Sequence, residues 1–156
     1  MPKPAPTGRK VVATNRRARY DYDILETFEC GLVLQGSEVK SLRAGQVQLK
    51  DSYAELRGAE LWLANAHIAP YQFARDGGHE PERLRKLLLH RRETERLVSK
   101  IKEAGLTLVP LSVYFTHGLA KVEIGLARGR RTIDKRNKIR EREQQREMDR
   151  ARRHRR

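Results

Sequence analysis

The amino-acid sequence predicts one mainly β domain with flanking helices, followed by a basic tail. Short segments in which apolar and polar residues alternate recur between residues 10 and 131, and this is the period of a strand with one buried face. Two pairs of these segments are separated by short turn signals, as in β-hairpins. The chain of 156 residues also has the size of one body with a single core.

The first part of the chain predicts a basic arm, a short strand and a short helix. Residues 1–9 contain three prolines, a glycine and basic side chains, so they cannot bury enough apolar area to offset the entropy of ordering, and we expect a disordered arm. Val11 to Ala13 are a strand candidate. Apolar residues then recur at helical spacing over residues 16–26, which predicts a helix with Asn15 as its N-cap.

A strand, a helical turn and a hairpin are predicted next. Apolar and polar residues alternate over residues 28–34, as in a half-buried strand. Residues 37–43 fit a helical turn that Ser37 caps. Residues 51–56 and 61–68 are strand-like and flank Arg57-Gly58-Ala59-Glu60, which predicts a hairpin. Trp62, in the second strand, is more typical of a core than of an RNA-stacking platform.

The second half of the chain predicts a loop, a helix and a second hairpin. Residues 76–81 indicate a loop, with Pro81 at a first helical position, and residues 92–104 have an apolar stripe that ends at Gly105. Residues 107–115 and 119–126 flank a turn at His117-Gly118, and Pro110 indicates an edge strand or a bulge. So many short strands favour a small closed or partly closed barrel, of which the five-stranded oligonucleotide-binding (OB) barrel is the familiar example.

Charge is concentrated at the two ends of the chain. The formal net charge is +14; residues 1–19 hold six Lys/Arg and no acid, and residues 128–156 hold 14 Lys/Arg against 5 Asp/Glu. The middle is therefore nearly neutral. Two basic arms favour a polyanionic partner, because each neutralised phosphate releases counterions. Nucleic acid is favoured over an anionic membrane surface, because neither arm has an apolar face opposite its charges.

The tail itself, residues 132–156, has almost no apolar residues but many helix formers. Asp134 with Lys138 and Asp149 with Arg153 are acid-before-base pairs one helical turn apart. An exposed helix without an apolar stripe is marginal alone. We therefore expect a tail that is disordered when free and helical when bound.

Enzymatic chemistry is not predicted. The five histidines lie far apart with no cysteine at ligand spacing, so the sequence gives no support for a metal site or a cofactor. Asp21 and Asp23 lie beside an arginine cluster and fit surface ion pairs better than a catalytic pair. The glycines at 125 and 129 lack the Lys-Ser ending of a phosphate loop. A lone cysteine, no long apolar run and no secretory signal predict a cytoplasmic protein.

Basic clusters in the body are candidate RNA contacts. Lys40 and Arg43 share a helical turn, and Arg85 and Lys86 belong to a second cluster that precedes three leucines. Such side chains can contact the phosphates or 2′-hydroxyls of a helical RNA and read its shape more than its sequence. Each of them alone also fits an ordinary solvated face, and it is the two charged arms that favour binding for the set.

Several segments carry a resemblance to a known family. They are residues 13–20, 26–34, 36–45, 51–54, 85–90, 122–127 and 134–136, including Glu38-Val-Lys-Ser-Leu-Arg43 and Arg85-Lys-Leu-Leu-Leu89. In this order and spacing they resemble SmpB, small protein B, the bacterial partner of transfer-messenger RNA. The resemblance implies an OB-type barrel over residues 10–131 that binds the tRNA-like domain of this RNA and delivers it to stalled ribosomes. It also implies a monomer whose C-terminal tail enters the decoding centre and the empty mRNA channel.

The resemblance and the basic clusters together give a set of candidate site residues. Asn15, Glu29 and Leu88 match the family's RNA-facing positions, and the clusters add Lys40, Arg43, Arg85 and Lys86. A glutamate can accept hydrogen bonds from base amino groups. The candidate ribosome-binding residues lie at the end of the body and in the tail: Gly129, Arg130, Arg131, Asp134, Lys135, Arg136, Lys138 and Arg142. Just before Asp134, relatives commonly carry an aromatic residue or a histidine that can stack on a ribosomal base, whereas this chain has Ile133.

Two other protein classes fit part of this pattern. A ribosomal protein with a globular body and basic extensions would have the same segregation of charge. The tail mixes acids with bases, however, whereas tails that penetrate ribosomal RNA permanently are almost free of acid, and this favours the rescue adaptor. An enzyme that acts on RNA is the third alternative and has the least support.

Overall fold

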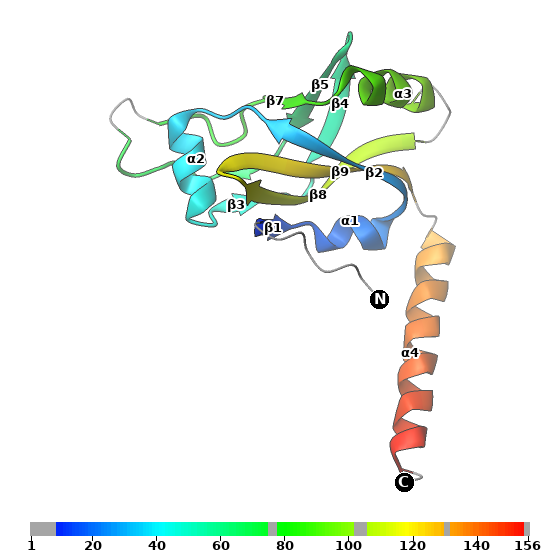
Figure 1. Ribbon diagram of the computed structural model, residues 1–156. Coiled ribbons are helices and arrows are strands. Elements are labelled where there is room, and N and C mark those ends of the chain that lie inside the picture. Colours follow the sequence, from blue (N-terminus) through cyan, green and yellow to red (C-terminus); the bar gives the residue numbers. More distant parts are fainter. Residues whose placement is uncertain (1–8, 75–77, 102–105, 130–131, 155–156) are drawn as a thin grey trace.

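The computed structural model describes residues 9–74, 78–101, 106–129 and 132–154, the last range by its backbone alone up to residue 138. The protein is mainly β with flanking helices, as the sequence predicts (Figure 1). The elements in chain order are β1 (Lys10–Thr14), α1 (Arg16–Asp21), β2 (Tyr22–Leu32), α2 (Gly36–Arg43), β3 (Val47–Gln48), β4 (Tyr53–Arg57), β5 (Glu60–Ala64), β6 (His67–Ile68), β7 (Arg85–Leu88), α3 (Arg91–Ile101), β8 (Leu106–Thr116), β9 (Leu119–Gly129) and α4 (Thr132–His154).

The strand pairings form a circuit. β8 pairs with β4, and the order continues through β5, β7, β2 and β9, which pairs back with β8. All of these pairings are antiparallel, and β1 adds to β8. β3 and β6 pair separately as a short two-stranded sheet. The body is therefore organised around antiparallel neighbours, most of which are far apart in sequence.

Both predicted hairpins are confirmed. β8 and β9 are antiparallel neighbours joined at His117 and Gly118, which both have positive φ, as a tight two-residue hairpin turn requires. Their register shifts between Pro110 and Ser112, so the irregularity expected at Pro110 is a bulge. β4 and β5 pair around Gly58, which also has positive φ.

The second strand of the β4–β5 hairpin is shorter than predicted. It ends at Ala64, because Asn65 has a φ of 60° and turns the chain, and β6 then pairs with β3 instead. Trp62 is half-buried on β5, opposite Glu55 and Lys86, and does not belong to the buried core.

The first helix is also shorter than predicted. α1 ends at Asp21, and the residues from Tyr22 onward, which the helical spacing assigned to the same helix, belong to β2. β2 pairs along almost its whole length with β9, from Tyr22 opposite Gly129 to Gly31 opposite Lys121. These long-range hydrogen bonds outweigh a weak local helical pattern.

The start of α2 differs from the prediction as well. Gln35 is the N-cap and its backbone N–H donates to the Glu38 carboxylate at 2.8 Å. Ser37 lies inside the helix, where its hydroxyl forms a hydrogen bond with His79 Nδ1 at 2.8 Å. The expected capping by Ser37 is therefore wrong, and the residue instead ties α2 to the segment before β7.

The structure contains a strand where a helix was expected. No helix starts at Pro81; a turn leads into β7, which lies between β5 and β2. α3 then covers Arg91 to Ile101, close to the predicted start, and the predicted stop at Gly105 lies outside the described residues. Part of the predicted loop at residues 76–81 also lies outside them.

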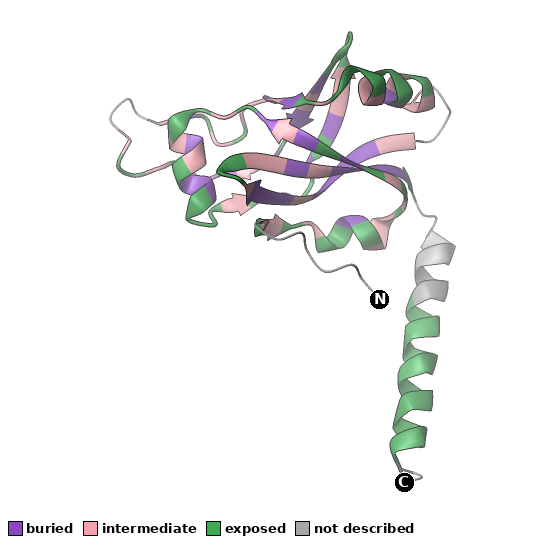
Figure 2. Ribbon diagram, viewed as in Figure 1, coloured by how far each residue is buried: buried purple, intermediate pink, exposed green. Residues whose placement is uncertain are grey.

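The core lies inside the circuit of strands (Figure 2). In the strand predicted over residues 28–34, the apolar residues Phe28, Cys30 and Leu32 are buried and Leu34 is half-buried. In the last hairpin Val122, Ile124 and Leu126 are buried. α2 contributes Leu42 and α3 contributes Leu97, both completely buried. Within the described part of the chain, none of the helices combines the length and the apolar character that crossing a membrane requires.

The C-terminal helix α4 leaves the body as a separate rod (Figures 1 and 2). All its side chains from residue 139 to residue 153 are exposed. The helical conformation agrees with the residue types in the tail, whereas a change between disordered and helical states stays a prediction. Of the predicted N-terminal arm, residues 1–8 lie outside the described residues.

Candidate nucleic-acid interface

Glu29 lies on the outer side of β2, opposite Glu123 of β9, with 49% of its side chain exposed. Tyr114 Oη and Arg9 Nη2 both donate to Glu29 Oε2, the latter at 3.2 Å. The hydrogen bond from Tyr114 is the main cause that holds the pKa of the Glu29 carboxyl below its ordinary value of 4.5, with help from Arg9 and Lys121, against the opposing effect of burial. Glu29 is thus an ionised acceptor, and one of its oxygens already has two donors.

Arg9 closes this cluster from the N-terminal side. Its guanidinium lies 3.7 Å from the centroid of the Tyr114 ring and 3.9 Å from Glu123 Oε2. The sequence assigned Arg9 to the disordered arm, but these contacts hold its side chain against the body. The surface at Glu29 therefore combines a carboxylate with the arginine that is paired with it.

Leu88 ends β7 and is paired with Gly31 of β2. Leu88 is 53% exposed, although it is apolar and belongs to a paired strand. A Cβ atom at Gly31 would lie 3.3 Å from Leu88 Cβ, so the glycine permits this close approach of the two strands. Exposed apolar area of this kind suits packing on a base or a ribose.

Three basic side chains of α2 and β7 lie at the surface, each close to another side chain. Lys40 and Arg43 are exposed on α2, and each lies over a ring: Lys40 over Tyr71 at 5.3 Å and Arg43 over Phe115 at 5.6 Å. Lys86 Nζ lies 3.2 Å from the Glu60 carboxylate at the surface. All three can reach a phosphate, because weak surface pairs of this kind are easily exchanged.

The structure contradicts Arg85 as a direct RNA contact. Its side chain is completely buried, with an ion pair from Nε to Glu38 and hydrogen bonds from Nη1 to Ala66 O at 2.6 Å and from Nη2 to Pro81 O at 2.9 Å. Burial lowers the pKa of Arg85 while the Glu38 carboxylate raises it, and the net shift is downward. Arg85 organises the interior beside α2 and does not face a ligand.

Asn15 has both ends of its amide engaged within the protein. Its Oδ1 accepts from the backbone N–H of Ala18 at 3.2 Å, so it caps α1 as predicted, and its Nδ2 donates to Pro110 O at 3.0 Å. The Asn15 backbone N–H also donates to Leu111 O at 2.7 Å. These bonds fix the junction of β1 and α1 to the bulge of β8.

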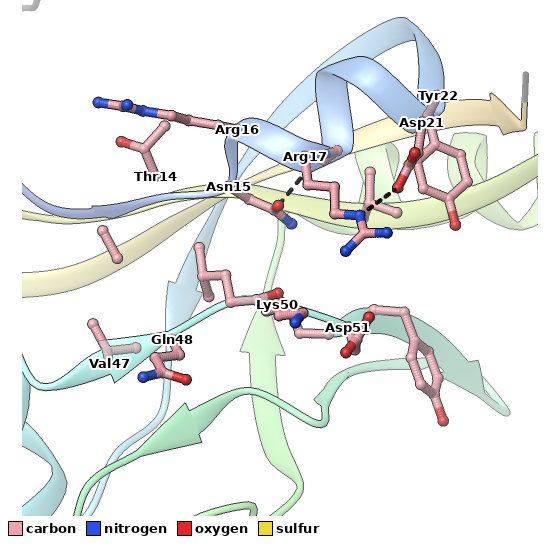
Figure 3. Close-up of a pocket in the computed structure, with 16 residues that line it drawn as sticks. Thr14, Asn15, Arg16, Arg17, Asp21, Tyr22, Val47, Gln48, Lys50 and Asp51 are labelled. Atoms are coloured by element: carbon pink, nitrogen blue, oxygen red, sulfur yellow. Dashed lines mark hydrogen bonds and ion pairs between the residues drawn. The ribbon is translucent and has the colours of Figure 1, made fainter. Parts of the chain in front are cut away.

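A cleft of about 640 Å³ lies directly beside Asn15 (Figure 3). One wall is α1 with its flanking residues, and the other is the segment from β3 to the start of β4. Arg17 reaches into the cleft and pairs with Asp21 at 3.4 Å, while Lys50 and Asp51 face it from the opposite wall. Asp51 has a φ of 62°, an uncommon conformation for a residue other than glycine.

The sequence did not single out this cleft. Its two walls are about 30 residues apart along the chain and meet only through the tertiary fold. The arginine cluster at residues 16–19 was visible as charge, but nothing in the pattern joined it to Lys50. In the described ranges there is no group of three or more His, Cys, Asp or Glu side chains that could hold a metal ion.

A mainly β body with exposed lysines and arginines, and with a long charged helix projecting from it, is typical of a nucleic-acid-binding protein. A sequence model of the SmpB protein family matches residues 12–154. The chain belongs to the SmpB family.

Relatives with known names agree with this assignment. The SsrA-binding protein of Thermobifida fusca is 58% identical over 149 residues, covering 96% of this chain and 93% of its own. The SsrA-binding protein of a Parafrankia species is 56% identical over 147 residues, covering 94% and 93%. A solved structure described as "tmRNA-SmpB: a journey to the center of the bacterial ribosome" has a TM-score of 0.65 and 53% sequence identity, and the match covers 77% of this chain and 85% of that chain.

Proposed function

We propose that this protein is an RNA-binding adaptor of trans-translation: it binds the tRNA-like domain of transfer-messenger RNA and delivers it to stalled ribosomes. The observation that carries the proposal is the near full-length similarity to SsrA-binding proteins together with the similarity to SmpB in a structure with transfer-messenger RNA and the ribosome. The protein catalyses no reaction in this role. It acts in the cytoplasm as a monomer without a cofactor.

The body is assigned to the RNA. We propose that the strands paired in this circuit form an OB-type barrel over residues 10–131 and that the surface of this barrel contacts the RNA. Glu29 offers an ionised acceptor to base amino groups, and Leu88 offers apolar area. Lys40, Arg43 and Lys86 supply positive charge for phosphates, and Asn15 positions the wall of the adjacent cleft.

The tail is assigned to the ribosome. We propose that residues 132–156 form a helix in the decoding centre and the empty mRNA channel, where a polyanionic wall stabilises a helix that has no apolar stripe. We also propose that the tail is disordered in the free protein and becomes helical when bound. The proposed ribosome contacts are Gly129, Arg130, Arg131, Asp134, Lys135, Arg136, Lys138 and Arg142.

Two variants test this division between body and tail. Truncation after Arg131 is expected to leave binding of transfer-messenger RNA intact and to abolish tagging of stalled nascent chains. Glu29→Ala in the full chain is expected to weaken RNA binding and to lose tagging as a consequence. Binding is measured by gel shift with purified RNA, and tagging in a reconstituted translation system. Loss of RNA binding in the truncated chain would show that the two functions are not separate.

A further inference from the structure

Two aromatic rings lie beside α2, in the segment after β6: Phe73 is exposed and Tyr71 is half-buried. Phe73 is 70% exposed, more than any other large apolar side chain in the described part of the protein. Its ring lies 5.5 Å from that of Tyr71, centroid to centroid, in an edge-to-face arrangement at 68°. At this exposure Phe73 adds little to the core, so packing does not explain an aromatic residue here.

A cation lies beside the two rings. Lys40 Nζ is 5.3 Å from the centroid of the Tyr71 ring, on the side of α2 that faces this segment. The rings and the first turns of α2 line a groove of about 520 Å³, and Lys40 is the one charged side chain among its described lining residues. Among the described residues that line the groove there is no carboxylate, so none of them would repel a negatively charged ligand.

Two aromatic rings with one cation, and with no acid among the described lining residues, match the chemistry of an unpaired nucleotide. A base can stack on the open face of an aromatic ring, and an adjacent phosphate can be bound by a lysine. An apolar protein surface would need neither the lysine nor the absence of acids. We propose that Phe73, Tyr71 and Lys40 form a platform on which an unpaired base of transfer-messenger RNA stacks, and this rests on the proposed function.

The position of the platform assigns it to the RNA held by the body. α2 and the segment that follows β6 lie at one end of the molecule, and α4 projects from the opposite end (Figure 1). A nucleotide on the platform is therefore remote from the helix assigned to the ribosome. Arg43, one turn after Lys40 on α2, extends the positive charge along the same face.

The first test compares the affinity of full-length variants for purified transfer-messenger RNA. Phe73→Ala is expected to lower the affinity about tenfold, the usual effect of removing one stacking ring, and Phe73→Trp to retain it. Leu119→Ala is the matched control, because Leu119 is also apolar and 61% exposed but lies at the tip of the β8–β9 hairpin, and it is expected to have no effect. Thermal unfolding checks that each variant is folded.

The second test separates stacking from charge. The probes are a short unstructured RNA and a ribose-phosphate chain of the same length without bases. The wild-type protein is expected to prefer the RNA, and Phe73→Ala to show a smaller preference without a change in salt dependence, because Glu29 and Leu88 are still present. Lys40→Ala is expected to keep the preference and to reduce the salt dependence by about one ion.

The results that would contradict the platform differ from those that would contradict the proposed function. If Phe73→Ala binds both probes and transfer-messenger RNA as Leu119→Ala does, the platform is wrong while the proposed function stands. If Phe73→Ala binds these RNAs normally but no longer binds a protein partner, the rings are a protein-binding surface. In that case, too, the platform is wrong while the proposed function stands. If the wild-type protein binds transfer-messenger RNA no better than an unrelated RNA of equal length, the proposed function itself is wrong, and the platform with it.

Discussion

Glu38 of α2 and Arg85 of β7 form an ion pair in which both side chains are completely buried. Arg83 donates to the second oxygen of the same carboxylate at 2.6 Å, and Arg85 also donates to backbone carbonyl oxygens. The pair links the helix next to the proposed RNA platform to the strand that ends at Leu88. A buried carboxylate with this many donors is satisfied only while every element around it keeps its place.

We expect Glu38→Gln to lower the free energy of unfolding by about 3 to 5 kcal/mol, because it leaves the Arg85 charge buried without a counterion. Urea denaturation at neutral pH measures this. Glu60→Gln is the control, since the pair of Glu60 with Lys86 lies at the surface, and it is expected to change the stability by less than about 0.5 kcal/mol. Similar effects of the two substitutions would contradict the assigned importance of the buried pair.

The same carboxylate predicts how stability depends on pH. Burial tends to raise the pKa of Glu38, but hydrogen bonds from Arg83, Gln35 and Arg85 outweigh it, and the net pKa lies below the ordinary value of 4.5. A carboxyl with a lower pKa in the folded state stabilises the fold above its unfolded pKa and loses this contribution as the pH falls through its folded pKa. We therefore expect urea midpoints to fall below about pH 4.5, and to fall less in Glu38→Gln. Parallel curves for the two proteins would argue against this explanation.

The sequence predicted those parts of the fold that local chemistry decides. The β8–β9 hairpin was found from its His117-Gly118 turn and its alternating residues, and Asn15 was found as the cap of α1. The missed strand β7 depends on partners far away, because Arg85 is buried only through a glutamate 47 residues earlier. An arginine within a basic cluster has the pattern of a surface residue, so the interior role of Arg85 could not be seen.

The candidate site was predicted to a similar extent. Glu29 and Leu88 were identified by resemblance, and both are exposed, but the donors that hold Glu29 come from Arg9 and Tyr114, at the two ends of the body's sequence. The cleft beside Asn15 likewise forms between segments that have no shared pattern. Turn and capping signals extend over a few residues, whereas these sites require contacts across the fold.

We expect Asn15 to contribute to the stability of the fold and not to contact the RNA directly. Asn15→Ala removes the cap of α1 and the hydrogen bond to Pro110, and we expect a loss of about 1 to 2 kcal/mol in the free energy of unfolding. Asn15→Ser keeps a capping oxygen but lacks the amide donor, so it is expected to lose less. Chemical denaturation measures both variants. Full stability of Asn15→Ala with weakened RNA binding would instead make Asn15 a direct contact.

Cys30 is expected to report on opening of the core. Burial is the main cause that raises the pKa of its thiol from 9.0 to about 12, with smaller effects from Glu93 and Glu29. The reactive thiolate is therefore scarce in the folded protein at about pH 8, and a thiol reagent should label Cys30 only through unfolding. Glu38→Gln should speed labelling at least about a hundredfold, in line with its expected loss of stability. Fast labelling of the stable wild-type protein would mean that β2 opens locally.

Salt is expected to weaken binding of transfer-messenger RNA steeply. If about six phosphates are contacted, the affinity should fall about a thousandfold between about 50 and 200 mM monovalent salt, because each contact releases counterions. The slope of log affinity against log salt concentration also shows which part of the chain contacts the phosphates. A chain truncated after Arg131 lacks most of the tail's positive charge. It should nevertheless keep nearly the same slope if Lys40, Arg43 and Lys86 bind the phosphates. Fluorescence anisotropy over a salt series measures both slopes. A flat response would refute an electrostatic interface, and a slope lost with the tail would move the phosphate contacts from the body to the basic extension.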